Sequence, residues 1–233
     1  MQRRTRLALS LATAAVLSVA VSLRAGSAED KYVLTELKEA APDALAAEIR
    51  GALGKTGFRV ADASGKAVSE IWFRGELPVL EKFQERDDTK YPIEPGTFVG
   101  AIRFPAASSD YRKQTIKAGV YTLRYGHQPQ DGNHLGTADY RDFLTIAPAA
   151  EDKSPAKLTQ DQAMELSKKA SGTTHPSILS LLPPQKKGRE KLPMLAHDAE
   201  HKFELLVVKV AGKAGDKTRK LQIELVAIGH AAE

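Results

Sequence analysis

The chain has 233 residues, of which 42% are hydrophobic and 27% are charged. These values are ordinary for a globular protein, so they exclude wholesale disorder and a protein with several membrane spans. The formal net charge is +5, and there is no cysteine. Disulfides, cysteine-ligated metal centres and thiol nucleophiles are therefore excluded.

The first 28 residues have the pattern of an export signal. Three arginines among the first six residues precede an apolar run over 7–23, and small residues follow up to Ala28. This pattern predicts a signal peptide over 1–28, cleaved after Ala28, and hence a periplasmic or extracellular protein. We expect no integral membrane span after cleavage. We also expect no lipoprotein anchor, because that processing requires a cysteine just after the cut.

Removing the signal peptide also changes the charge. Four arginines and no acidic residue leave with it, so the formal net charge falls from +5 to about +1. A strong basic excess would favour nucleic acid or anionic lipid as a partner. Because most of the excess belongs to the predicted signal, we expect no nucleic-acid partner.

The first part of the mature chain predicts a short helix and a hairpin. Apolar residues recur every four positions over 42–53, with Gly54 after the last of them, which is typical of a short amphipathic helix. Two runs of strand character, 57–62 and 68–74, flank a Ser-Gly turn signal and predict a hairpin. Trp72 lies within the second run, so we expect it in the core.

The middle of the chain predicts three more strands. The charged, proline-containing stretch 76–95 suits a surface excursion. Strand character follows over 96–104, 119–126 and 142–148. Tyr121 stands two residues after a glycine at the start of a strand, which is the pattern of a tyrosine corner whose hydroxyl bonds back to the preceding turn.

The last part of the chain predicts a second helix and a second hairpin. Thr159 and Gln162 form a capping box and Gly172 stops the pattern, so we expect a helix over 159–171. The proline-rich and basic stretch that follows it predicts a loop with at most one helical turn. Apolar runs over 202–210 and 220–229 predict a hairpin with a long connection.

About seven strands and only two helices indicate a mainly β protein. Because the helices do not alternate with the strands, we predict an antiparallel β-sandwich of the Greek-key or immunoglobulin-like kind. We expect a single domain over 29–233, with marginal helical additions at 42–53 and 159–171.

One long loop concentrates the residues that could make a site. It runs between two predicted strands and has 15 residues, from His127 to Arg141. Loops of that length without helix or strand are usually functional or flexible. The candidate binding residues are polar side chains of this loop and its end, together with one later histidine: His127, Asp131, Asn133, His134, Asp139, Asp142 and His175.

These side chains allow two kinds of metal site. His127, His134 and His175 are candidate ligands for zinc, because three protein ligands and a water make the catalytic zinc layout. Asp131 and Asn133, on either side of a glycine, offer oxygen donors for calcium. The spacing matches no compact metal signature. The alternative is an ordered loop whose acids cap backbone groups, with Asp142 paired to a nearby arginine, Arg141 or Arg124.

Other motifs fall short of a known chemistry. No serine lies in a Gly-x-Ser-x-Gly elbow, and the glycines of 51–57 lack the pattern of a phosphate-binding loop. His197 and His201 are four residues apart, but an aspartate stands where a zinc protease needs its glutamate base. The segment 119–136 resembles the closing strand and loop of a cupredoxin, yet without cysteine a blue-copper centre is excluded.

The sequences YTLRYGHQPQDGNHLGTADYRDF, EIWFR and SGTTHPSILSL resemble a group of uncharacterised secreted bacterial proteins over most of the mature chain. This resemblance implies export and carries no activity.

Our leading prediction is a secreted or periplasmic β-sandwich that acts as a non-catalytic binding or structural module. It would meet an unknown ligand or envelope component through the 127–142 loop, with no cofactor. The alternative is a metal-dependent hydrolase with His127, His134 and either Asp139 or His175 as ligands. Asp131 or Asp142 would then act as its base.

Overall fold

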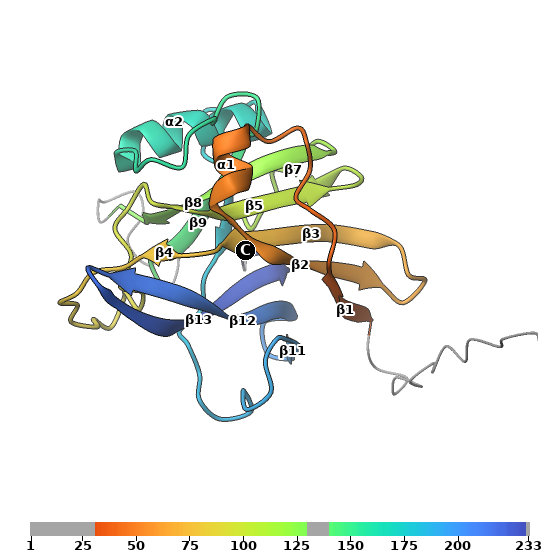
Figure 1. Cartoon of the computed structure of the whole chain (residues 1–233). Helices are drawn as coiled ribbons and strands as arrows, with labels where there is room; N and C mark the ends of the chain where they lie inside the picture. The colour runs from red at the N-terminus through yellow and green to blue at the C-terminus, as the bar shows by residue number, and fades with distance from the viewer. Residues whose placement is uncertain (1–30, 130–139, 232–233) are drawn as a thin grey trace, which may run out of the picture. The chain divides into compact units, whose positions relative to one another are not determined.

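Antiparallel β-sheets make up most of the computed structural model, which describes residues 31–129 and 140–231 (Figure 1). Strands account for 45% of the chain and helices for 9%, so the prediction of a mainly β protein with two helices is confirmed.

A curled sheet of seven strands contains the β8–β9 pair that carries the predicted loop. Every neighbouring pair in it is antiparallel. In spatial order its strands are β1 (Tyr32–Leu37), β2 (Leu53–Asp62), β3 (Ala67–Arg74), β5 (Phe98–Phe104), β8 (Gly119–His127), β9 (Asp142–Pro148) and β10 (Ile178–Ser180).

A second sheet is built on a long hairpin. Its strands are β11 (Met194–Asp198), β12 (Phe203–Ala214) and β13 (Lys217–Ile228), with β4 (Leu77–Pro78) pairing parallel to the end of β12. A separate small ribbon joins β6 (Ser108–Ser109) to β7 (Thr115–Ile116). The chain also touches the second sheet directly after β10, where the Leu182 amide donates to the Glu224 carbonyl at 2.9 Å.

The two sheets share one apolar core. Alternation along each strand sends every second side chain inward, so β8 contributes Leu123 and Tyr125 and β13 contributes Ile223 and Leu225 to the same buried cluster. Burial of these large side chains removes apolar area from water, which is the main favourable term in folding.

The first helix is shorter than the sequence predicted. Instead of 42–53, α1 spans Ala47–Ala52, because Ala46 offers no side-chain cap and Leu53 already has extended dihedrals. Gly54 was expected to end the helix but lies in β2. The buried Ile49 still packs on the outer face of β5, against Phe98 and Ala101.

The second helix is confirmed. α2 spans Gln160–Ser171, and its Thr159 N-cap accepts from the Gln162 amide while the Gln162 side chain accepts from the Thr159 amide. Gly172 adopts φ +70, the left-handed conformation that ends a helix at little cost when the residue is glycine. The helix lies beside β9 (Figure 1).

The tyrosine corner and the core tryptophan are also confirmed. The Tyr121 hydroxyl donates to the Lys117 carbonyl at 2.7 Å. Trp72 is only 3% exposed, and its Nε1 donates to the Glu39 carbonyl at 3.3 Å. Tyr121 thus holds the turn before β8, and Trp72 holds the segment that follows β1.

Three predictions about connecting segments were wrong. The stretch 76–95 contains β4 and holds Tyr91 and Ile93 fully in the core. The stretch after α2 contains β10 and β11. The long loop expected between 210 and 220 is absent, because β12 and β13 continue as a ribbon joined only by Gly215 and Asp216.

Candidate functional site

The predicted site begins where β8 and β9 end side by side. His127 is the last residue of β8, Asp142 is the first of β9, and the two are register partners. Asp131, Asn133, His134 and Asp139 lie outside the described residues. The structure therefore describes three of the seven predicted site residues, namely His127, Asp142 and His175.

Asp142 is a fully buried carboxylate with two donors. The Tyr125 hydroxyl donates to its Oδ1, and the Lys90 amide donates to its Oδ2 at 2.6 Å. Burial raises the pKa of Tyr125 far above its ordinary value, and the charge of Asp142 raises it further. The phenol therefore stays protonated and acts as the donor.

His127 completes this cluster from the solvent side. Its Nε2 lies 2.7 Å from the Tyr125 hydroxyl oxygen, which gives its own proton to Asp142 and so accepts from the imidazole. The side-chain amide of Gln160 holds the backbone of His127. Its oxygen accepts from the His127 N–H and its nitrogen donates to the His127 carbonyl, each at 3.0 Å. The side chain of His127 is 24% exposed.

The structure does not bring His175 to this cluster. The His175 carbonyl accepts from the Ser171 hydroxyl at 3.2 Å, and Ser171 lines the same pocket as Pro148, so His175 lies near the Pro148 end of β9, whereas His127 lies level with Asp142. Six residues of strand separate the two levels, which corresponds to about 20 Å. Among residues 31–129 and 140–231, no group of three or more His, Cys, Asp or Glu side chains could hold a metal.

The arginines expected to pair with Asp142 bind other partners, so that part of the ordered-loop alternative was wrong. Arg141 forms an ion pair with Asp88 at 3.2 Å. Arg124 forms one with Asp152 at 2.7 Å, on the opposite face of the sheet from Tyr125. Neither pairing was visible in the sequence, because both acids are distant in the chain.

The other histidine pair does not form a metal site either. His197 lies in β11 with its Nδ1 2.9 Å from Glu204, and His201 lies in the turn that follows, 2.9 Å from Asp198. Each imidazole thus faces a carboxylate of its own.

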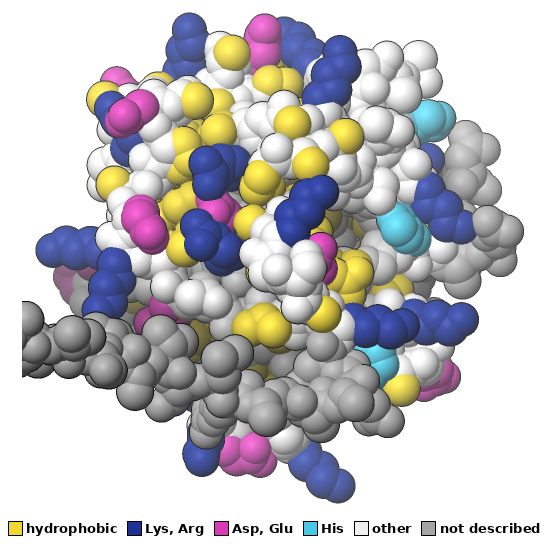
Figure 2. Space-filling view, turned by 90° about the vertical axis from the view of Figure 1, so that its right-hand side faces the viewer, with side chains coloured by type: hydrophobic (Ala, Val, Ile, Leu, Met, Phe, Trp, Pro, Cys, Tyr) yellow, Lys and Arg dark blue, Asp and Glu magenta, His cyan; other side chains and the backbone are white. Residues whose placement is uncertain are grey.

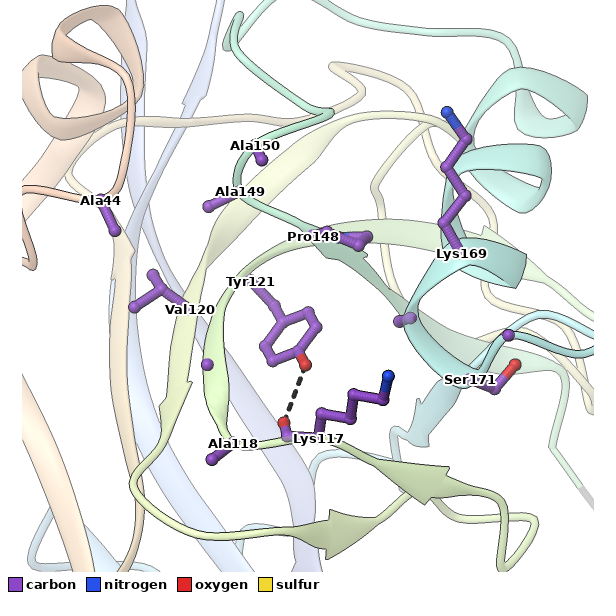
Figure 3. A pocket seen from close by; sticks show the side chains of 13 residues that line it. Ala44, Lys117, Ala118, Val120, Tyr121, Pro148, Ala149, Ala150, Lys169 and Ser171 are labelled. Atoms are coloured by element: carbon purple, nitrogen blue, oxygen red, sulfur yellow. Dashed lines mark hydrogen bonds between the residues drawn. The ribbon is translucent and has the colours of Figure 1, made fainter.

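A pocket of about 440 Å³ lies at the other end of the β8–β9 pair (Figure 3). It opens between the turn before α1, the start of β8, the end of β9 and the end of α2. Its lining is dominated by small and apolar residues: Ala44, Lys117, Ala118, Gly119, Val120, Tyr121, Pro148, Ala149, Ala150, Lys169, Ala170, Ser171 and Gly172. Ligand pockets in proteins fall in this size range and have this apolar character.

One wall and the floor of this pocket belong to the hydrogen-bonded β8–β9 pair. Val120 and Tyr121 belong to β8, and the Ala149 amide donates to the Val120 carbonyl at 3.0 Å. Burial raises the pKa of Tyr121, so its phenol stays neutral, and its hydroxyl is turned towards the Lys117 carbonyl (Figure 3). The ring therefore presents apolar surface.

Two lysines supply the charge of the pocket. The Lys169 ammonium lies 2.7 Å from Glu151 and points away from the hollow, whereas Lys117 extends across it towards the end of α2 (Figure 3). Among the described residues, Lys117 has no ion-pair partner, and the lining contains no acidic side chain.

Sequence reasoning missed this pocket because its residues carry no chemical signature. Alanines and glycines line it, and they come from four segments that only the sheet topology brings together. The nearest sequence signal was the tyrosine corner at Tyr121, which correctly located the rigid turn beneath the pocket.

The face in Figure 2 mixes basic, acidic and apolar side chains. In the part of the chain that is described, no helix is both long and apolar enough to cross a membrane. Comparison of the chain with protein-family models, with curated proteins and with solved structures finds no match.

Proposed function

We propose that this protein is an exported, non-catalytic binding protein that holds a small, largely apolar molecule in the pocket between α2 and the β8–β9 pair. The pocket itself carries this proposal. It combines a volume of about 440 Å³ with a lining rich in alanine, to which Val120, Pro148 and the ring of Tyr121 add apolar surface. A concave apolar site on a rigid sheet is the usual form of a small-molecule binding site.

The proposal includes export of the protein and a β-sandwich fold. Export is supported by the arginines, apolar run and small residues of the first 28 positions. A sandwich is supported by the single core that the two sheets share. His127 and Asp142, the two ends of the loop where the sequence predicted binding, then lie at the opposite end of the β8–β9 pair from the ligand.

No observation favours the metal-dependent hydrolase over this proposal. Of its candidate ligands, His134 and Asp139 lie outside the described residues. The remaining two, His127 and His175, lie at opposite ends of β9.

A neutral fluorescent probe tests the proposal. N-phenyl-1-naphthylamine emits strongly only in apolar surroundings, so we expect a saturable rise in its emission on titration with the folded protein. Ala150 is exposed and lines the pocket, so Ala150→Trp should fill the space and abolish the rise. Ala47→Trp, at an exposed position on α1 outside the lining, should leave it intact.

Two results would overturn the proposal. One is the absence of saturable binding by the folded wild-type protein. The other is binding that survives in the Ala150→Trp variant, since the probe would then lie elsewhere on the molecule.

A further inference from the structure

We infer that the molecule held in this pocket is a monocarboxylate: a compact apolar body with one carboxylate, which Lys117 binds. The inference rests on the proposed function and names the class of its ligand. It is drawn from the charges around the pocket and from the hydrogen bonds that its polar groups already make.

The charged side chains in the lining are all positive. Lys117 and Lys169 are its charged residues, and no aspartate or glutamate contributes to it. The end of α2 adds the partial negative charge of helix carbonyls, and the two lysines of its last turn are paired with Glu165 and Glu151, so among the described residues Lys117 is the lining charge without an ion-pair partner. An anionic group is therefore favoured over a cationic one.

The two lysines differ in availability. Lys169 is held by Glu151 at 2.7 Å, whereas Lys117 has no ion-pair partner among the described residues and extends across the pocket (Figure 3). A carboxylate at the pocket mouth would meet the Lys117 ammonium without breaking an existing pair. Charge-assisted hydrogen bonds of this kind are stronger than neutral ones.

The remaining polar groups at the end of α2 are already committed. The Ser171 hydroxyl lies 3.0 Å from the Thr173 hydroxyl and donates towards the carbonyl of His175 at 3.2 Å. The Gly172 amide donates to the Lys168 carbonyl. Because a single ammonium is left, a monoanion fits better than a phosphate, which proteins bind with several donors or arginine forks.

The rest of the ligand must be apolar. Methyl groups of Val120 and Ala149 and the ring of Tyr121 line the pocket beside Lys117 (Figure 3). A polar body would lose its hydration there without gaining partners, which costs free energy. A compact aliphatic or aromatic carboxylate satisfies both requirements.

Three probes with the same body separate this inference from the proposed function. Cyclohexanecarboxylate, its neutral amide and cyclohexylmethylamine are each used to displace N-phenyl-1-naphthylamine from the full chain at neutral pH. We expect the carboxylate to compete about three- to tenfold better than the amide, and the amine to compete worst. In Lys117→Gln the carboxylate and the amide should become equal.

Two control variants sharpen the test. Lys117→Arg keeps the charge and should keep the preference for the carboxylate. Lys169→Gln removes an ammonium that Glu151 already neutralises and should leave most of the preference in place. Because Lys117 is exposed, we expect its variants to fold, and circular dichroism and thermal unfolding of each variant verify this.

The outcomes are distinguishable. If the fluorescent probe does not bind, the proposed function fails and this inference fails with it. If the probe binds but the carboxylate and the amide compete equally, the proposed function stands and the monocarboxylate is wrong. The same conclusion follows if the preference persists in Lys117→Gln.

Discussion

The hydroxyl of Tyr125 donates a hydrogen bond to the carboxylate of Asp142, and both groups are buried at the end of the β8–β9 pair. His127 lies over this pair and donates to the same hydroxyl. A buried carboxylate is tolerated only when its oxygens are hydrogen-bonded. The cluster therefore stabilises the point at which both strands leave the sheet.

Tyr125→Phe tests this relationship. Removing the hydroxyl takes one of the two hydrogen bonds to Asp142 away and leaves the one from the Lys90 amide, so it should lower the free energy of unfolding by about 1–3 kcal/mol. Urea unfolding measures the loss. Tyr32→Phe, at the start of the edge strand β1, should change it little, and an unchanged stability in Tyr125→Phe would refute the role of the bond.

Arg124 is the second buried polar centre, and lysine should not replace it. All five of its N–H groups donate, two to the Asp152 carboxylate and three to the carbonyls of Gly96, Ser154 and Ala156. An ammonium has only three donors and no planar fork.

Arg124→Lys should therefore cost about 3–5 kcal/mol, as expected when a buried ion pair is broken. Thermal or urea unfolding gives the value, and Arg112→Lys at an exposed position is the matched control. A cost similar to that of the control would show that the network contributes little.

Glu70 should make stability depend on pH in the acid range. Burial opposes its ionisation, but hydrogen bonds and charges from Arg103 and Arg59 outweigh burial and lower its pKa. A carboxyl whose pKa is lowered in the folded state stabilises the fold above its unfolded pKa of about 4.3, and this contribution is lost as pH falls through the folded value.

Glu70→Gln should reduce stability by about 1–2 kcal/mol at pH 7, an effect limited by the partial exposure of both arginines. The difference between variant and wild type should shrink as the pH falls below about 4. Urea unfolding from pH 7 to pH 3 measures it. A difference that is constant over this range would contradict the assignment.

Gly57 touches the single tryptophan, which gives an optical test of packing. A Cβ at this position would lie 2.4 Å from Nε1 of Trp72, so the indole must move. Gly57→Ala should shift the fluorescence emission of Trp72 to longer wavelength and destabilise the fold. Gly51→Ala has open space and should leave the emission unchanged; equal spectra for both variants would disprove the contact.

The sequence predicted correctly those helices and strands whose ends or residue pattern are determined by neighbouring residues. Thr159, Gln162 and Gly172 define both ends of α2 from the sequence, and runs of strand character define β8 and β9. β1 was missed because it is an edge strand whose side chains are mostly partly or fully exposed. α1 was overextended mainly at its start, where the Leu45 amide donates to the Pro42 carbonyl in a turn at 3.1 Å, and by one residue at its end, where Leu53 pairs with Arg74 in a strand.

The candidate site could be predicted from the sequence only in part. His127 and Asp142 were identified from their chemistry, but their shared partner, Tyr125, lies in an apolar strand and gives no sign of its role. The pocket requires that 44, 117–121, 148–150 and 169–172 converge. Such convergence depends on long-range strand pairing, which the residues of any one segment do not encode.

The most direct test of the account is the position of a bound ligand. Nuclear Overhauser effects between cyclohexanecarboxylate and the methyl groups of the protein would locate its ring. We predict contacts with Val120, Ala149 and Ala150 and none with the His127 imidazole. Contacts at His127 with none at these three methyl-bearing residues would contradict the account and return the binding site to the 127–142 loop.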